Sequence, residues 1–232
     1  MHISLQNISK SYQIPDTDIK REVLLSVSLE IEKGSSIGIV GPSGSGKSTL
    51  LNIISSLDKP DAGIVKINNQ IINELNANEL AEFRNRKIGF IFQMHHLLPQ
   101  LNVLENVLVP TIPVKEKSYR REAVKRAKEL LERVGLQDRI SQLPSQMSVG
   151  ECQRTAVVRA LINQPEIILA DEPTGSLDHE NAEMLGNLLV EIQKNMPAAS
   201  QEQKVTLIIV THAQELAEKM DKTYKLINGT LN

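Results

Sequence analysis

Residues 41–49, GPSGSGKST, combine glycines, hydroxyl side chains and one lysine in the pattern of a phosphate-binding loop. Glycines let such a loop curl so that its backbone N–H groups face the β- and γ-phosphates of a nucleotide. Lys47 adds a positive charge there, and the Ser48 hydroxyl is a ligand for Mg²⁺. An apolar run precedes the loop and a helix is expected to begin at Lys47, which favours this interpretation over an ordinary glycine-rich turn. The predicted nucleotide-contacting residues of the loop are Gly41, Pro42, Ser43, Gly44, Ser45, Gly46, Lys47, Ser48 and Thr49.

Two adjacent carboxylates, Asp171 and Glu172, end another apolar run in the segment EIILADEPTGSLD. Neighbouring residues of a strand point to opposite sides, so one carboxylate can join a metal shell while the other acts on a water. Phosphoryl transfer needs that division, because the protein mainly positions an attacking oxygen in line and stabilises spreading charge. We therefore predict Asp171 as a Mg²⁺ ligand and Glu172 as the catalytic base, against the alternative that the pair only caps a helix.

A second helix start, in QMSVGECQRTAVVRAL at residues 146–161, also has the features of an anion site. Ser148 and Glu151 have the spacing of a capping box, and Gly150 between them permits close approach of the backbone. The first turn of a helix leaves backbone N–H groups free to hold an anion. A chain with a phosphate loop elsewhere has no evident need of this second device.

Composition limits the classes of protein to consider. The chain has 232 residues, 41% of them apolar, which suffices for one large α/β domain or two small ones. A net charge of −2 gives no electrostatic attraction to nucleic acid or anionic lipid, so we expect no nucleic-acid partner. The single Cys152 suits a reducing compartment, and the first ten residues lack the apolar core of a signal peptide. No apolar run approaches the roughly 20 residues of a membrane-spanning helix, so any membrane role requires a partner.

Two kinds of apolar pattern predict two kinds of strand. Alternation along Val23, Leu25, Val27, Leu29 and Ile31 predicts a half-buried antiparallel strand, and residues 1–8 follow a weaker pattern of the same kind. Short continuous apolar runs predict strands covered on both faces, as in the parallel sheet of an α/β fold. These runs are SSIGIV at 35–40, IGFIF at 88–92, EIILA at 166–170 and VTLIIV at 205–210.

The region Asn102–Leu161 reads as helical throughout. NVLE at its start has the spacing of a capping box, and a later helix is expected to end at Gly135 as its C-cap. Near the end of the chain, NGT at 228–230 predicts a hairpin turn.

The loop GPSGSGKST, the segment MSVGE and the segment ILADEPTGSLD, in this order and spacing, resemble the nucleotide-binding subunits of ABC transporters. The resemblance covers essentially the whole chain. It implies an α/β fold with a P-loop NTPase core, a mostly parallel sheet, an antiparallel β subdomain and an inserted α-helical subdomain. In the single domain 1–232, the core would comprise 1–92 and 164–232, and the helical subdomain 93–163 would carry the MSVGE segment.

The resemblance also implies roles for residues that are uninformative alone. Gln93 in FQMHHLL matches the glutamine that senses Mg²⁺ and the membrane partner. His212 in IVTHAQE matches the histidine on the γ-phosphate, and Tyr12 in SKSY matches the aromatic residue that stacks on adenine. Without the resemblance, such a histidine would be read as a cap or surface residue and such a tyrosine as part of the core. The implied cofactors are ATP and Mg²⁺.

Two such subunits face head to tail in this family, and the MSVGE helix end of one binds the γ-phosphate of ATP seated in the other. The resemblance therefore implies that Ser148, Gly150 and Glu151 serve a second copy of the chain. Met147 and Val149 depart from the usual segment, in which leucine and glycine occupy these positions.

Within the family, FIFQMHHLLPQLNVLENVLVP and DEPTGSLD resemble the subgroup serving lipoprotein release, macrolide-type efflux and antimicrobial-peptide resistance. We favour lipoprotein release, with the chain at the cytoplasmic face of the inner membrane and in contact with it only through a transmembrane permease. A chromosome-maintenance ATPase would need a long coiled coil between Gln93 and Ser148, where only about 50 residues lie and no sustained heptads occur. A nucleotide-binding regulatory module with little turnover stays open as an alternative because of the altered MSVGE segment.

Overall fold

The computed structural model describes residues 2–17, 19–195 and 204–232. In this part of the chain, six strands form a central sheet in the order β10-β9-β3-β8-β7-β6. Neighbours from β9 to β6 run parallel, and β10 pairs antiparallel with β9. The strands are β3 (Ser36–Val40), β6 (Ile88–Ile91), β7 (Ile167–Asp171), β8 (Thr206–Thr211), β9 (Lys222–Ile227) and β10 (Thr230–Leu231). The predicted mostly parallel sheet is confirmed, as is the hairpin turn between β9 and β10.

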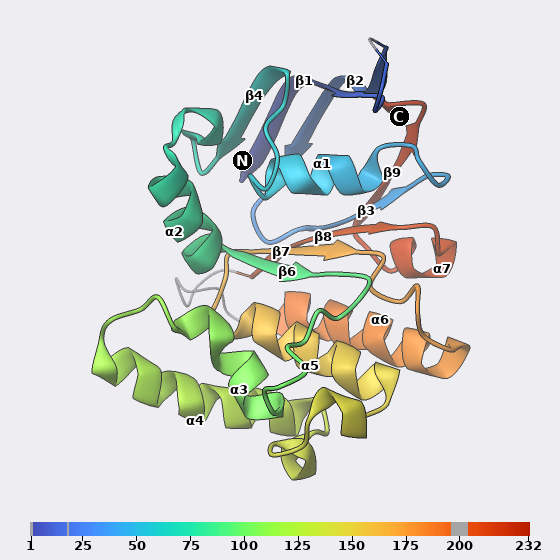
Figure 1. Ribbon diagram of the computed structural model, residues 1–232. Helices are drawn as coiled ribbons and strands as arrows, with labels where there is room; N and C mark the ends of the chain where they lie inside the picture. The colour runs from blue at the N-terminus through green and yellow to red at the C-terminus, as the bar shows by residue number, and fades with distance from the viewer. Residues whose placement is uncertain (1, 18, 196–203) are drawn as a thin grey trace.

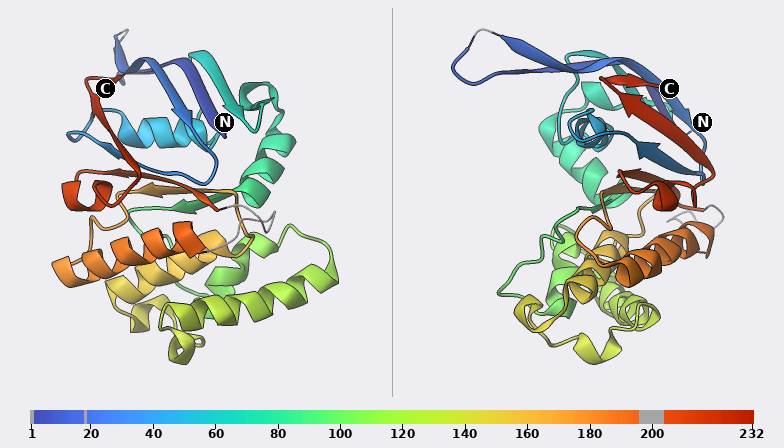
Figure 2. Two further views of the ribbon diagram at one scale, coloured as in Figure 1. Left: turned by 180° about the vertical axis from the view of Figure 1, so that it is seen from behind. Right: turned by 90° about the vertical axis from the view of Figure 1, so that its right-hand side faces the viewer.

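A second, antiparallel sheet lies above the first in Figure 1, with helix α1 (Lys47–Ile54) between them. Its strands have the order β2-β1-β4-β5, and the hairpin of β1 and β2 projects beyond the rest of the molecule (Figure 2). Leu50, Leu51 and Ile53 of α1 belong to the apolar core that both sheets share. The strands are β1 (Ile3–Gln13), β2 (Lys20–Ile31), β4 (Ala62–Ile67) and β5 (Gln70–Ile71).

The alternation predicted for β2 holds in only part of the strand. Val27, Leu29 and Ile31 are buried as expected, but Leu25 is 39% exposed and Leu24 is 1% exposed. The cause is an irregularity in the pairing of β1 with β2. Ile8 of β1 pairs with Val27 of β2. Two residues later in β1, Lys10 pairs with Leu24, which is three residues earlier in β2. The extra residue on β2 reverses which side chains face the core, so the prediction for Leu25 was wrong.

Helices cover the opposite face of the central sheet, below it in Figure 1. The capping box of Asn102 with Glu105 is confirmed at the start of α3. The C-cap of α4 is Val134, one residue before the predicted Gly135, which follows it with a φ of 71°. Helical structure throughout 102–161 is wrong for residues 109–116 and 136–147, where short 3₁₀ turns and irregular backbone replace an α-helix. Gly135 stops α4 in a left-handed conformation, and Pro144 cannot donate a helical hydrogen bond. The helices below the sheet are α3 (Val103–Leu108), α4 (Lys117–Arg133), α5 (Val149–Leu161) and α6 (His179–Asn195). Helix α2 (Ala77–Lys87) instead contributes Leu80 to the core that the two sheets share, and the short α7 (Gln214–Ala217) follows β8.

One apolar core joins α3, α4, α5 and α6 to the central sheet. Val157 and Leu161 of α5, Leu185 and Leu189 of α6 and Ile209 of β8 are all buried in this core. The helical region thus packs on the sheet instead of standing apart from it. The boundaries 93–163 for a helical subdomain stay a prediction.

A buried polar cluster near the start of the chain links the two sheets. The Nδ1 atom of His2 lies 2.6 Å from the Thr206 hydroxyl, and its Nε2 atom lies 3.7 Å from the Glu166 carboxylate. Burial lowers the pKa of His2 from its ordinary value of 6.5 to about 4, against the attraction of Glu166. Burial also opposes ionisation of Glu166, but hydrogen bonds from Lys87 and Asn68 outweigh it and hold the pKa of that carboxyl below its usual range.

His2 should make the folded state sensitive to mild acid. Below pH 6.5 the unfolded chain binds a proton at this side chain that the folded chain does not bind until the pH reaches about 4. Stability should therefore fall as the pH drops through this interval, by up to about 3 kcal/mol. When the free energy of unfolding is measured with denaturant at pH 7.5 and pH 5, His2→Asn should lose much less stability between the two pH values than the wild type. The same substitution at the exposed His179 is the control, and an equal loss in His2→Asn would contradict the prediction.

Candidate active site

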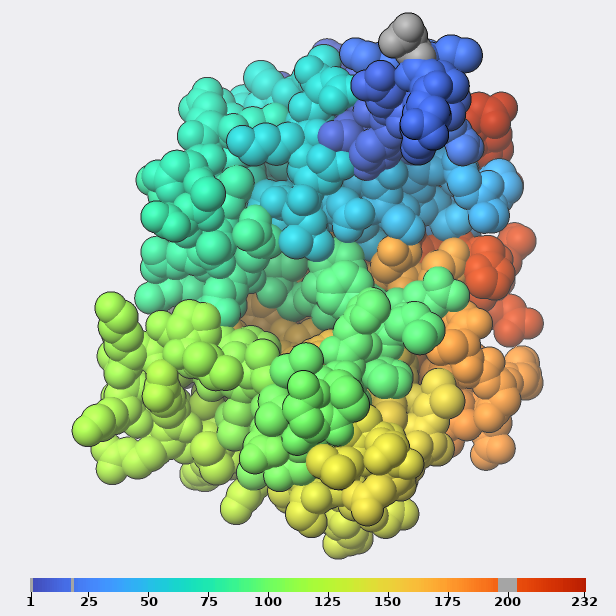
Figure 3. Space-filling view, in the orientation of Figure 1, coloured from blue at the N-terminus to red at the C-terminus, as the bar shows by residue number. Residues whose placement is uncertain are grey.

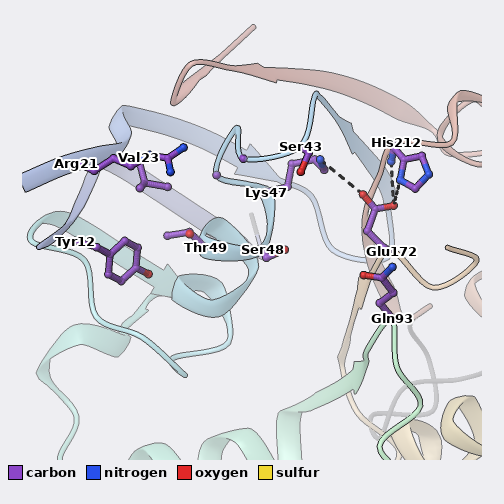
Figure 4. A pocket seen from close by; sticks show the side chains of 12 residues that line it. Tyr12, Arg21, Val23, Ser43, Lys47, Ser48, Thr49, Gln93, Glu172 and His212 are labelled. Atoms are coloured by element: carbon purple, nitrogen blue, oxygen red, sulfur yellow. Dashed lines mark hydrogen bonds and ion pairs between the residues drawn. The ribbon is translucent and has the colours of Figure 1, made fainter. Parts of the chain in front are cut away.

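The segment between β3 and α1 has the backbone of an anion-binding loop (Figure 4). Gly46 precedes α1 with a φ of 103°, and no side chain caps the N–H groups of the first helical turn. A Cβ atom at Gly41 would lie 2.2 Å from the Leu226 carbonyl oxygen, and one at Gly46 would lie 2.7 Å from that of Val23. Glycine is therefore required at both positions, and the uncapped N–H groups face the cavity.

Lys47 is held over this loop. Its side chain is only 7% exposed, and its Nζ atom donates hydrogen bonds to the carbonyl oxygens of Gly41, at 2.8 Å, and Pro42, at 3.1 Å. The same ammonium lies 3.6 Å from Oε1 of Glu172. The ammonium of Lys47 thus lies beside the loop backbone and a single carboxylate, and could neutralise an anion bound over the loop.

Asp171 and Glu172 contact different partners, as the sequence predicts for adjacent carboxylates. Oδ1 of Asp171, the last residue of β7, accepts a hydrogen bond from the Ser48 hydroxyl at 3.1 Å. Burial and the neighbouring charge of Glu172 raise the pKa of Asp171. Glu172 lies beyond the strand with a φ of 44°, and its Oε2 atom accepts a hydrogen bond from the backbone N–H of His212 at 3.0 Å. This positive φ, and not simple strand alternation, separates the two side chains.

Lys47, Ser48, Glu172 and His212 line one cavity of about 700 Å³, whereas Asp171 is not among its lining residues. Segments far apart in the sequence converge there, since the lining comes from β1, β2, the phosphate loop and the residues that follow β6, β7 and β8. Figure 4 shows Lys47, Glu172 and His212 linked at one end and Tyr12 at the other. The lining residues are Tyr12, Arg21, Val23, Ser43, Gly44, Gly46, Lys47, Ser48, Thr49, Gln93, Glu172 and His212.

The end of the cavity at Tyr12 has a flat, accessible ring. Tyr12 is 42% exposed, its hydroxyl donates to Asp58 at 2.6 Å, and Lys10 lies 5.1 Å from the ring centroid. Arg21 and Val23 line the same end, and sequence analysis did not identify them. Their signal was the pairing of β1 with β2, which puts Arg21 opposite Tyr12, but the register could not be read in advance.

Gln93 and His212 enter the cavity from opposite sides of Glu172. Nδ1 of His212 lies 2.9 Å from Oε2 of Glu172. A Cβ atom at Gly175 would lie 3.0 Å from the Gln93 amide nitrogen, so glycine leaves room for that side chain. Gly175 lies within the segment ILADEPTGSLD, and no role for it follows from the sequence alone.

Oxygen donors near Ser48 fit a magnesium ion. Mg²⁺ prefers hard oxygen ligands and usually keeps several waters, so it needs few side chains from the protein. The Ser48 hydroxyl and the Asp171 carboxylate already meet at 3.1 Å, and Gln93 lines the same cavity. Within the described ranges no cluster of three or more histidines, cysteines or carboxylates could hold a metal. The donor set therefore suits an ion that is completed by phosphate oxygens and water.

Ser148, Gly150 and Glu151 do not line this cavity. The predicted capping box is present, because the Ser148 hydroxyl accepts from the Glu151 N–H at 3.2 Å and Glu151 accepts from the Ser148 N–H at 2.8 Å. Arg139 donates to the other Glu151 oxygen at 3.0 Å. The hydrogen bonds from Ser148, and then Arg139, lower the pKa of Glu151. The carboxylate of Glu151 is thus occupied within its own chain.

The same first turn of α5 packs closely on α6. A Cβ atom at Gly150 would lie 2.7 Å from the side-chain oxygen of Asn181, whose amide donates to Asp178 at 2.8 Å and 3.0 Å. Gly150 thus has a packing role inside its own chain. Val149, in contrast, is 52% exposed.

Val149→Gly should change the ATPase rate of the assembled transporter by less than about tenfold, equivalent to ~1.4 kcal/mol on the barrier. The reason is that the valine side chain is exposed while the cap around it is intact. Steady-state ATPase rates test this. Gly150→Asp is the control and should nearly abolish activity, since even its Cβ meets Asn181 and its carboxylate repels phosphate. A much larger rate increase in Val149→Gly would mean that the valine is a brake and would favour the regulatory alternative.

The chain is similar over most of its length to known proteins of one family. A sequence profile of the family described as ABC transporter matches residues 24–175. The chain is 46% identical over 227 residues to the lipoprotein-releasing system ATP-binding protein LolD 1 of Rhodopirellula baltica, which covers 98% of this chain and 94% of that protein. It is 44% identical over 229 residues to the lipoprotein-releasing system ATP-binding protein LolD of Bacteroides thetaiotaomicron, with 99% and 98% covered.

A solved structure has the same architecture. It is the dimeric post-hydrolysis state of an ATP-binding cassette bound to ADP and phosphate, with a TM-score of 0.85 at 36% identity over 99% of this chain and 96% of that one. No helix in the described ranges is both long and apolar enough to cross a membrane. The profile, the near-complete relatives and the cavity lead to one conclusion: the chain belongs to the ABC transporter family, as one of its ATP-hydrolysing subunits.

Proposed function

We propose that the chain powers the release of lipoproteins from the inner membrane by hydrolysing ATP. The main support for ATP hydrolysis is that the phosphate loop, Glu172 and His212 line one cavity. Lipoproteins are proposed as the cargo because two relatives, at 46% and 44% identity, are described as lipoprotein-releasing system ATP-binding proteins.

The proposed binding roles follow the two ends of the cavity. Adenine stacks on Tyr12, while the loop N–H groups and Lys47 bind the β- and γ-phosphates. Ser48, Asp171 and Gln93 hold Mg²⁺ as oxygen donors. When bound, the ion neutralises charge on the phosphate oxygens.

Glu172 is the proposed general base. A water attacking the γ-phosphate must lose a proton, and a carboxylate oxygen within hydrogen-bond reach can accept it. The His212 N–H fixes Oε2 of Glu172 at 3.0 Å, so the carboxylate is oriented before the nucleotide arrives. The imidazole of His212, which lines the same cavity, is proposed to contact the γ-phosphate.

The second anion site is proposed to serve a second copy of the chain. Ser148 and Gly150, at the start of α5, lie outside the cavity of their own chain, and the dimeric state of the cassette with ADP and phosphate supports pairing of two subunits. In a head-to-tail dimer the first turn of α5 would bind ATP held by the partner copy. Closure of the dimer would then move transmembrane permease subunits at the cytoplasmic face of the inner membrane.

Reconstitution tests the cargo. The chain is purified with the permease subunits that it binds, and the complex is placed in proteoliposomes containing a fluorescent lipoprotein. ATP should release the lipoprotein, and Glu172→Gln should not. ATP-dependent uptake of a macrolide or an antimicrobial peptide instead would assign the efflux alternative.

A regulatory module with little turnover is the competing function, and the valine at position 149 is the observation that favours it. The capping box of Ser148 and Glu151 is nevertheless intact. An ATPase assay on the purified chain separates the two functions, because only the transport function requires multiple turnovers.

A further inference from the structure

The loop that carries Gln93 has little backbone structure of its own. Among the described residues, the backbone of residues 93–97 makes no hydrogen bond to other backbone groups. The loop lies on the surface between the cyan upper part and the yellow helices in Figure 3, and Met94 is 65% exposed. Something other than a strand ladder must therefore fix the position of Gln93.

Side chains of α5 hold the loop instead. Arg159 donates from Nη2 to the His95 carbonyl at 2.6 Å and from Nη1 to the His96 carbonyl at 2.7 Å. Gln153, six residues closer to the start of α5, donates to the Phe92 carbonyl at 2.9 Å. The two side chains thus hold the backbone on both sides of Gln93 and Met94.

The contacts of Arg159 are strong ones. A guanidinium that makes two parallel hydrogen bonds fixes geometry as well as distance, and bonds from a charged donor exceed neutral ones. His96 has a φ of 47°, an uncommon conformation that the contacts of Arg159 help to maintain. Burial lowers the pKa of Arg159, and a desolvated charge requires such partners.

The other end of α5 is the proposed phosphate site for the partner copy. Ser148 caps the helix there, 11 residues before Arg159, which corresponds to about 16 Å along a helix. A helix of this length is stiff, so a displacement of its first turn moves Arg159 with it. Gln93 and the first turn of α5 are therefore connected through hydrogen bonds from Arg159 and Gln153 to the backbone on either side of Gln93.

We propose that Arg159 is a positioning residue that couples Gln93 to the first turn of α5. Docking of the partner's ATP on that turn then brings Gln93 toward the Mg²⁺ position of its own chain. The inference rests on the proposed role of Gln93, and its experiment distinguishes the two. Arg159 touches neither nucleotide nor metal and acts through the backbone of His95 and His96.

Limited proteolysis tests the attachment without any need for activity. Arg159 holds carbonyl groups of the loop, so its loss should free the loop backbone. In Arg159→Met, which keeps an apolar stem, cleavage within residues 93–97 should be at least about tenfold faster than in the wild type. Arg126→Met is the matched control, since Arg126 donates to the Ile162 carbonyl at the end of α5, at 2.8 Å, and does not contact the loop. It should leave cleavage of the loop unchanged. Unchanged cleavage in Arg159→Met would overturn the proposal, whatever the ATPase rates.

A double-mutant cycle tests the coupling. In the assembled transporter, Arg159→Met should lower kcat by roughly tenfold with little change in KM, because a misplaced group near the chemistry costs rate. Gln93→Ala should lower kcat at least as much, and the double variant should be no slower than Gln93→Ala alone. Arg159→Lys, which keeps the charge but cannot bridge both carbonyls, should be intermediate.

Each result decides one point. Effects of Gln93→Ala and Arg159→Met that multiply would overturn the coupling while leaving Gln93 its role. A wild-type rate in Gln93→Ala would remove that role and the coupling with it. An equal loss of kcat in Arg126→Met would reduce Arg159 to a purely structural residue.

Discussion

Glu172→Gln is expected to bind ATP normally but to hydrolyse it at least about 100-fold more slowly than the wild type. The amide cannot accept the proton of the attacking water, while its remaining oxygen can still accept the His212 N–H that Glu172 accepts at 3.0 Å. The shape of the site should thus survive and only the chemistry should be lost. Isothermal calorimetry measures ATP binding, and phosphate release measures hydrolysis.

An ATP-bound dimer should accumulate in this variant, because hydrolysis no longer separates the two copies. Size-exclusion chromatography with ATP and Mg²⁺ should show it at twice the mass of the chain. Glu183→Gln is the control, since Glu183 is exposed on α6 and does not line the cavity. Hydrolysis by Glu172→Gln at the wild-type rate would show that Glu172 is not the base.

Lys47→Ala should raise the dissociation constant for ATP at least about 100-fold, as expected when charged hydrogen bonds worth roughly 1.5–3 kcal/mol each are lost. Lys47 is buried, and its ammonium sits over the Gly41 and Pro42 carbonyls with Glu172 at 3.6 Å. The variant removes the positive charge and leaves the negative charge of Glu172 facing the incoming phosphates. Both effects oppose nucleotide binding.

Calorimetry with ATP and Mg²⁺ measures the affinity, and thermal unfolding without nucleotide reports whether the loop still folds. Lys128→Ala, an exposed lysine on α4, is the control and should bind ATP like the wild type. Near-normal affinity in Lys47→Ala would refute the role of the lysine.

The parts of the site that sequence predicts best are those built from neighbouring residues. The strand, loop and helix around Lys47 and the capping box at Ser148 each lie within a few positions of the chain, and local geometry determines them. The strands of the central sheet were predictable for a similar reason. Short apolar runs covered on both faces leave few alternatives.

The parts that sequence missed depend on contacts between distant segments. One extra residue in β2 turned Leu25 outward, and no property of residues 23–31 alone reveals it. Arg21 joins the cavity only through its pairing with Tyr12. Arg159 is an ordinary helical arginine until the fold brings the His95 carbonyl to it, so its role could not be read from spacing.

The position of β3 in the central sheet has a consequence for biosynthesis. This strand leads into the phosphate loop, yet both of its neighbours, β8 and β9, come from the last part of the chain. The Leu226 carbonyl, on β9, also closes against Gly41 of the loop. A ribosome that has made residues 1–205 has therefore produced the whole loop sequence without the strands that flank it. A nascent chain arrested at that length should not retain an ATP analogue, whereas the released chain should. On this expectation, nucleotide binding would be deferred until translation is almost complete, and unfinished chains would not pair through ATP.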